Sequence, residues 1–131
     1  MIYLEGVTKI YGKSEKKALD NLSVHIKPKE FIIFVGLSGA GKSTLTRLIT
    51  HEEELTSGKI TVGGINYATL KKKDVPYLRR KIGVVFQDFK LLNKKTVYEN
   101  IAYALEVAGI SNKTIRSRVP QVLKMVGLEN K

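Results

Sequence analysis

Nine consecutive residues in the first half of the chain have the types and the order needed to hold a polyphosphate. Residues 36–44 read Gly-Leu-Ser-Gly-Ala-Gly-Lys-Ser-Thr, which matches the pattern G-x-x-x-x-G-K-[ST], and they follow the apolar run at residues 31–35. Gly36, Gly39 and Gly41 allow backbone dihedrals that other residues avoid, so that successive amides can face one anion. The pattern predicts a phosphate-binding loop between a strand and a helix.

The last three residues of this motif supply charge and hydroxyl oxygens. Lys42 can place an ammonium at the β- and γ-phosphates, and the helix expected to begin there adds unpaired amides and about half a positive charge. Ser43 offers a hydroxyl to a magnesium ion, which prefers oxygen ligands, and Thr44 can offer another hydroxyl to the phosphates. A glycine-rich turn without a ligand would explain the glycines but not the Lys-Ser pair.

Composition restricts the class of protein. The 131 residues are 43% hydrophobic and 27% charged, as in a soluble globular domain with one core. The absence of cysteine excludes a disulfide framework and a cysteine-ligated metal site. Residues 31–35 form the longest apolar stretch, far below the ~20 residues of a membrane-spanning helix, and the N-terminus lacks a secretion signal. We therefore expect a cytoplasmic chain.

The net charge of +11 leaves several interpretations open. Much of it lies in Lys71-Lys72-Lys73 and Arg79-Arg80-Lys81. Such clusters occur on solvated faces, on surfaces attracted to anionic membranes and in nucleic-acid-binding proteins. Tyr67 and Tyr77 flank the basic run singly and form no recognisable platform for stacking a single strand, which argues against nucleic acid.

Hydrophobic spacing predicts two kinds of strand. Apolar and polar residues alternate near residues 2–4, 22–26 and 60–62, which is typical of an antiparallel sheet with one face toward water. Unbroken apolar runs at residues 31–35 and 82–86 predict two buried strands, the first of which leads into the phosphate loop.

The first half also contains a predicted loop and two predicted helices. Residues 11–17 are polar and rich in turn formers, so we expect a loop there. Leu45, Leu48 and Ile49 share one face of the helix that follows the phosphate loop. A short helix is expected at residues 71–80, begun or interrupted at Pro76.

Two further helices are predicted in the second half. The capping box Thr96-x-x-Glu99 precedes apolar residues at helical spacing that continue to Gly109. Another helical pattern covers residues 115–126, where Pro120 predicts a kink or a break. We divide the chain into a nucleotide-binding part, residues 1–87, and a helical part, residues 88–131.

Taken together, these motifs resemble the N-terminal part of an ABC transporter ATP-binding subunit. The resemblance extends over all 131 residues. The landmarks are Tyr11, the phosphate loop and Val-Val-Phe-Gln-Asp at residues 84–88. Residues 75–80, 86–92 and 96–100 most resemble the FtsE group of cell-division ATPases, although lipoprotein and macrolide exporter ATPases share most of the pattern. The resemblance implies an α/β phosphate-loop NTPase fold, in which a mixed sheet with an antiparallel part precedes the start of a helical subdomain.

The resemblance also implies roles for individual residues. It places Tyr11 against adenine, a contact worth ~1–3 kcal/mol per base. It implies that Gln87 reaches the magnesium ion and the attacking water, so that Lys42 and Gln87 act in catalysis and Ser43 and Gln87 bind the metal. The cofactors are ATP and Mg2+. The residues expected at the nucleotide are Tyr11, Gly36, Ser38, Gly39, Ala40, Gly41, Lys42, Ser43 and Thr44.

Two departures from the family pattern carry expectations of their own. Lys29 stands where the family usually has glycine, so the turn there either avoids a positive backbone angle or tolerates strain. The signature motif and the catalytic glutamate of the family are missing from the 131 residues. We therefore expect a truncated domain that binds ATP and magnesium but hydrolyses ATP negligibly alone, and that self-associates or has marginal stability.

The function expected from this resemblance is that of an FtsE-type ATPase coupled to the transmembrane subunit FtsX. The full-length protein would form a homodimer of ATPase subunits, would work with the division machinery, and would lie at the inner face of the cell membrane through its transmembrane partner. One alternative is the ATPase subunit of a lipoprotein or macrolide exporter. The alternative from another class is a basic nucleic-acid-binding module.

Overall fold

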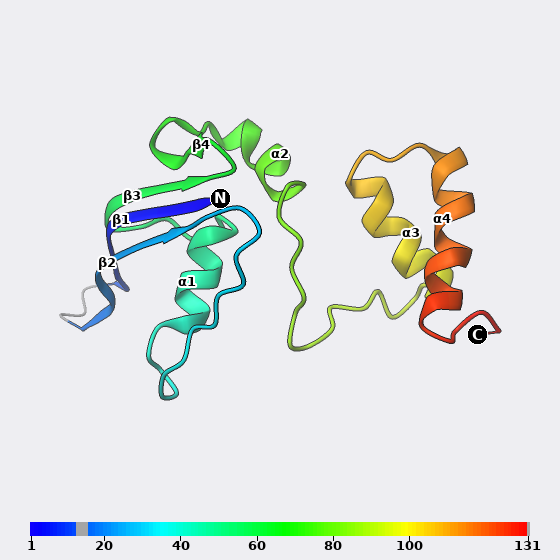
Figure 1. Ribbon diagram of the computed structural model, residues 1–131, viewed down its shortest axis with the longest axis horizontal. Coiled ribbons are helices and arrows are strands. Elements are labelled where there is room, and N and C mark those ends of the chain that lie inside the picture. Colours follow the sequence, from blue (N-terminus) through cyan, green and yellow to red (C-terminus); the bar gives the residue numbers. More distant parts are fainter. Residues whose placement is uncertain (13–15, 131) are drawn as a thin grey trace. The chain divides into compact units, whose positions relative to one another are not determined.

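The computed structural model describes residues 1–12 and 16–130, which fall into two compact units, Met1–Ile82 and Gly83–Lys131. Figure 1 shows that the first unit contains the sheet and the second is helical. Of the polar loop expected at residues 11–17, residues 13–15 lie outside the described part, and Lys17 already belongs to a strand. No helix in the described ranges is long and apolar enough to cross a bilayer.

An antiparallel sheet forms the frame of the first unit, as the alternating pattern predicted. The strands are β1 (Ile2–Ile10), β2 (Lys17–Ile26), β3 (Ser57–Val62) and β4 (Ile65–Asn66), in the spatial order β2-β1-β3-β4. Leu4 of β1 lies opposite Val24 of β2 and Ile60 of β3, so apolar side chains of three strands share one face.

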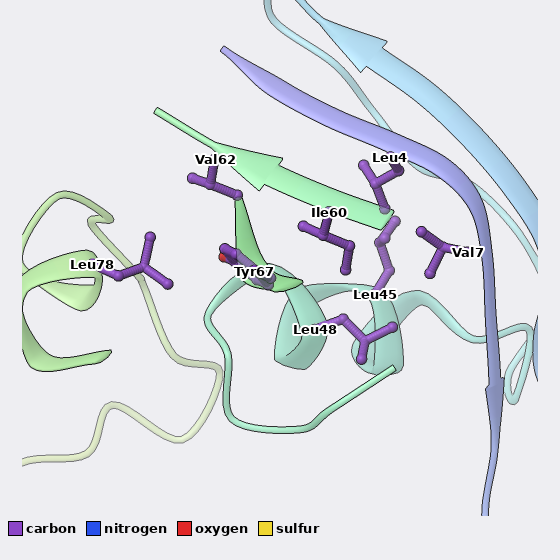
Figure 2. Packing of buried hydrophobic residues seen from close by; sticks show 8 residues of the cluster. All are labelled: Leu4, Val7, Leu45, Leu48, Ile60, Val62, Tyr67 and Leu78. Carbon is purple, nitrogen blue, oxygen red and sulfur yellow. The ribbon is translucent and has the colours of Figure 1, made fainter. Parts of the chain in front are cut away.

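Helix α1 (Lys42–Ile49) packs its apolar stripe against this sheet. Figure 2 shows Leu45 and Leu48 in one cluster with Leu4, Val7 and Ile60 of the strands, and Leu48 is 0% exposed. Full burial of one leucine side chain contributes roughly 1.5–3 kcal/mol. The packing therefore holds the first turn of α1, where the phosphate loop ends, at a set position on the sheet.

The C-terminal end of α1 is held by side chains from later in the chain. The Tyr67 hydroxyl donates to the carbonyl oxygen of Ile49, while Arg79 donates from Nε to the carbonyl of Thr50 at 3.1 Å and from Nη2 to that of His51 at 2.9 Å. These donors satisfy carbonyls that a helix end leaves unpaired. They come from η1 (Tyr67–Thr69) and from α2 (Val75–Arg79), which follows η2 (Lys72–Asp74).

The two buried strands expected at residues 31–35 and 82–86 are not formed. Neither segment has strand structure, and the side chains of Val35 and Val85 are 87% and 100% exposed. A buried strand needs hydrogen-bonding neighbours and a cover on both faces. The described sheet consists of β1 to β4 and pairs with neither run. An unbroken apolar run predicts a strand only where the fold supplies these neighbours.

The turn before residues 31–35 has a positive backbone angle at Lys29, the strained one of the two conformations that the sequence left open. Lys29 has φ +67°, in the left-handed region that glycine occupies more readily. The Glu30 carboxylate accepts from the amide of Lys27 at 2.8 Å, and the Glu30 amide donates to the carbonyl of Lys27 at 3.4 Å. These two bonds close the turn around Lys29 and offset its strain.

In the second unit, α3 (Val97–Val107) begins and ends as its sequence predicts. Thr96 and Glu99 form the reciprocal capping box. At the other end, Gly109 donates to the carbonyl of Glu106 at 2.9 Å and Ile110 to that of Leu105 at 3.0 Å. This pair of bonds is a Schellman motif, with Gly109 at φ +81°.

Helix α4 (Asn112–Met125) runs through Pro120 without the break that the sequence predicted as one possibility. Val119 and Leu123 on either side of Pro120 are buried in the core that α4 shares with α3. Pro120 itself is exposed, so the backbone carbonyl that loses its partner can turn to water. Packing on both sides of the proline keeps the helix continuous.

Replacing Tyr67 by Phe should remove one pH-dependent part of the free energy of unfolding. Burial raises the pKa of Tyr67 to about 12, whereas an unfolded tyrosine ionises at about 10. The folded state therefore keeps the phenol proton longer. Its contribution is complete below about pH 10 and should be lost as the pH rises toward about 12.

Urea unfolding followed by circular dichroism at a series of alkaline pH values measures this effect. Tyr77→Phe, at an exposed tyrosine of the same unit, is the control and should keep the pH profile of the unaltered protein. Identical profiles for both variants would show that the buried phenol is not the source.

Candidate functional site

The loop at residues 36–44 follows the apolar run at residues 31–35 and ends in the first turn of α1, and two of its glycines have the geometry that the sequence predicted. Gly39 and Gly41 have φ +79° and +87°. At Gly41 a Cβ atom would overlap the carbonyl oxygen of Ala18 on β2, so the loop passes too close to the sheet for any side chain. The prediction of such a dihedral is wrong for Gly36, which lacks a positive φ. There the constraint is steric, because an added Cβ would lie 3.1 Å from that of Ala40.

The N-terminal end of α1 has unpaired backbone donors. The amide of Ala40 donates to the carbonyl of Leu37 at 3.1 Å, but the amides of residues 41–44 have no acceptor within the described part of the chain. No side chain caps this end of the helix. These free N–H groups lie at the positive end of the helix dipole and can bind an anion.

Lys42 adds a full positive charge at the same place. Its Nζ atom donates to the carbonyl oxygens of Gly36 and Leu37 at 2.7 and 2.8 Å, so the side chain bends back over the loop. An ammonium has three N–H donors, and the third remains for another acceptor. The Ser43 hydroxyl, one residue further, is exposed and makes no hydrogen bond within residues 1–12 and 16–130.

Tyr11 lies next to the loop although it is far from it in sequence. Its hydroxyl is 3.3 Å from Oγ1 of Thr44, in the first turn of α1, and the side chain is 42% exposed. The structure thus brings Tyr11, Lys42, Ser43 and Thr44 to one end of α1. An exposed aromatic ring at this position can stack on a flat base.

Gln87 is the one expected site residue that belongs to the other unit. It lies in the second unit, exposed, in a turn that the amide of Phe89 closes on the carbonyl of Phe86 at 3.3 Å. The phosphate loop belongs to the first unit. The contact of Gln87 with magnesium stays a prediction.

Three charged residues beside Tyr11 were missed by the sequence reasoning. Glu53 pairs with Lys9 through Oε2 at 3.4 Å and with Nη1 of Arg47 through Oε1 at 3.2 Å. Hydrogen bonding by Tyr11, then by Arg47 and Lys9, lowers the pKa of the Glu53 carboxyl. The same Glu53 hydrogen bond raises the pKa of Arg47. No spacing rule links these residues, because they come from β1, α1 and the turn after α1.

A glycine-rich loop that enters a helix with unpaired amides, a lysine and two hydroxyls defines a phosphate-loop nucleotide-binding protein. A comparison with protein families identifies which family of nucleotide-binding proteins this is. The model of the ABC transporter family matches residues 19–131, and the chain belongs to this family.

The relatives include two kinds of ATP-binding subunit. Over 131 residues the chain is 51% identical to the cell division ATP-binding protein FtsE of Streptococcus pneumoniae, all of this chain aligning with 56% of that protein. It is 43% identical to the methionine import ATP-binding protein MetN of Helicobacter pylori, of which it covers 40%. The chain therefore spans little more than half the length of the FtsE relative and less than half that of the MetN relative.

A solved structure supports the fold. The ATP-binding cassette MJ0796, in a dimeric post-hydrolysis state bound to ADP and Pi, matches 99% of this chain with a TM-score of 0.85 and 35% identity, and 59% of that cassette is covered. The predicted ABC ATPase fold and the resemblance to the FtsE group are confirmed.

Alanine substitutions at the two left-handed glycines should differ in cost. Gly39→Ala meets only the backbone penalty, about 1–2 kcal/mol for a left-handed residue, because nothing lies within 4 Å of its added Cβ. Gly41→Ala meets the same penalty and also the carbonyl of Ala18, so it should lower the free energy of unfolding clearly more. Chemical denaturation of both variants measures the difference. Equal costs would contradict the close approach of the loop to β2.

Proposed function

We propose that this chain binds ATP with magnesium, as the ATP-binding region of an FtsE-type ABC ATPase. The observation that carries the proposal is the set of unpaired amides at residues 41–44 beside the Lys42 ammonium. Such an end of a helix suits the polyphosphate of a nucleotide, since both the helix dipole and the lysine favour negative charge. Membership of the ABC transporter family supports the choice of ATP.

Each residue of the cluster has a proposed role. The loop from Gly36 to Thr44, with Ser38 and Ala40 among its members, surrounds the phosphates with backbone donors. Lys42 binds the β- and γ-phosphates by exchanging one loop carbonyl for a phosphate oxygen or by using its third N–H. Tyr11 stacks on the base, because its exposed ring is held near Thr44.

Mg2+ fits the oxygen donors that the family places at this site. Ser43 and Gln87 would hold the ion, and when bound it would neutralise charge on the β- and γ-phosphates. Lys42 acts on the same phosphates, so it would contribute to hydrolysis as well as to binding. Hydrolysis itself we propose for the whole protein, as a homodimer of ATPase subunits; the dimeric MJ0796 structure supports this assembly.

We propose further that the partner is an FtsX-type transmembrane subunit, which would keep the protein at the inner face of the cell membrane. The higher identity to FtsE, 51% against 43% for MetN, supports this choice. A groove of about 620 Å3 in the second unit offers an apolar surface for it. Its apolar lining is Phe89, Leu91, Ile101, Ala104, Leu105, Ile110 and Val122.

A second candidate partner follows from the similarity to MetN. The MetN relatives support an importer-type membrane subunit as the second candidate. The comparisons favour neither the lipoprotein or macrolide exporter nor the nucleic-acid-binding module.

Lys42→Ala should weaken binding of Mg-ATP roughly 10- to 100-fold, because a charge-assisted hydrogen bond contributes about 1.5–3 kcal/mol. Binding of adenosine should stay unchanged, since the stack on Tyr11 remains. Isothermal calorimetry with both ligands measures the two affinities, and Lys59→Ala, at an exposed lysine of β3, is the control. Equal losses for both ligands would contradict the role of Lys42, and no binding of Mg-ATP by the folded, unaltered protein would overturn the proposed function.

Leu91→Asp should abolish co-purification with an FtsX-type membrane subunit, because it places a charge in the apolar groove where Leu91 is 64% exposed. Met125→Asp, at a residue of α4 that is 84% exposed and does not line the groove, should leave this co-purification unchanged. Capture by the membrane subunit of a methionine importer instead would favour the second candidate. Loss of capture in both variants would argue against the groove as the docking surface.

A further inference from the structure

Lys9 is the residue that lies against the ring of Tyr11. Its Nζ atom is 4.9 Å from the ring centroid, donates to the carbonyl oxygen of Glu54 at 2.7 Å and is 3.4 Å from Oε2 of Glu53. The side chain of Lys9 is only 14% exposed. Three contacts therefore hold the Lys9 ammonium in place. A cation over the face of an aromatic ring attracts the ring electrostatically.

Glu53 connects this ammonium to α1. Its Oε1 is 3.2 Å from Nη1 of Arg47, and its amide donates to the carbonyl of Arg47 at 3.3 Å. Oε2 is buried, and its partner in the described part of the chain is the Lys9 ammonium. The Glu53 carboxylate thus pairs with Arg47 through one oxygen and with Lys9 through the other.

Tyr11 is consequently held by Thr44 and Lys9 as well as by its hydrogen bonding with Glu53. Thr44 is within hydrogen-bond distance of the hydroxyl end of the ring, and Lys9 covers one of its faces. Because Tyr11 is still 42% exposed, part of the ring remains open to a ligand. Stacking on a ring that is already oriented avoids the entropy cost of ordering it when the ligand binds.

We infer that Lys9 and Glu53 are positioning residues for the nucleotide base: Glu53 holds Lys9 against one face of Tyr11, which keeps the other face ready to stack on a purine. This inference rests on the proposed function, because it concerns the same nucleotide site. It assigns to both residues an effect on the base but none on the polyphosphate, which the loop amides and Lys42 bind.

Binding of two ligands by matched variants tests the assignment. Lys9→Met keeps the length of the side chain without its charge, and Glu53→Gln keeps the shape without the ion pair. Each should weaken Mg-ATP roughly three- to tenfold, the effect of a partly buried cation–π contact, and should leave magnesium tripolyphosphate unchanged. Lys59→Met breaks the exposed pair with Glu5, at 3.5 Å on the same sheet, and should change neither ligand.

A double-mutant cycle and a conservative variant separate positioning from a general loss of structure. In a Tyr11→Ala background, Lys9→Met should have no further effect on Mg-ATP, whereas Lys9→Arg in the unaltered background should keep most of the affinity. Losses of equal size for Mg-ATP and tripolyphosphate, or an undiminished effect of Lys9→Met without Tyr11, would overturn the inference and leave the proposed function intact. Failure of the unaltered protein to bind either ligand would overturn both.

Discussion

The packing of α1 against the antiparallel sheet is the constraint on which the described site depends. Leu45 and Leu48 are buried against β1 and β3, and the loop before α1 passes so close to β2 that only glycine fits at residue 41. With both contacts in place, the first turn of the helix cannot move away from the sheet. This packing therefore fixes the position of its unpaired amides.

The electrostatics of the site follow from this placement. The helix end is positive because its amides are unpaired, and Lys42 adds its charge to the same region. The negative charge beside Tyr11 belongs to Glu53, which is neutralised by Lys9 and Arg47. A carboxylate with two cationic partners competes little for the phosphate-binding groups. The same pairing holds the ammonium against Tyr11.

The helix ends of the second unit are determined by residues that are close together in sequence. The ends of α3 are set by the capping box at Thr96 and by the Schellman motif at Gly109, both readable from neighbouring residues. Asn100 adds to them, because its side chain bonds the backbone of Leu92, Lys95 and Thr96. Burial of Val119 and Leu123 then keeps α4 continuous through Pro120.

Local chemistry in the sequence was sufficient for the phosphate loop and the helix ends, because each depends on residues within a few positions of one another, and the alternation of apolar and polar residues indicated the antiparallel strands. It was insufficient for residues 31–35 and 82–86, whose apolar runs predict strands although strand formation depends on distant neighbours. Only the tertiary structure brought Glu53 to Lys9 and Tyr11. No local pattern indicates a contact that arises when β1, α1 and the turn after α1 pack together.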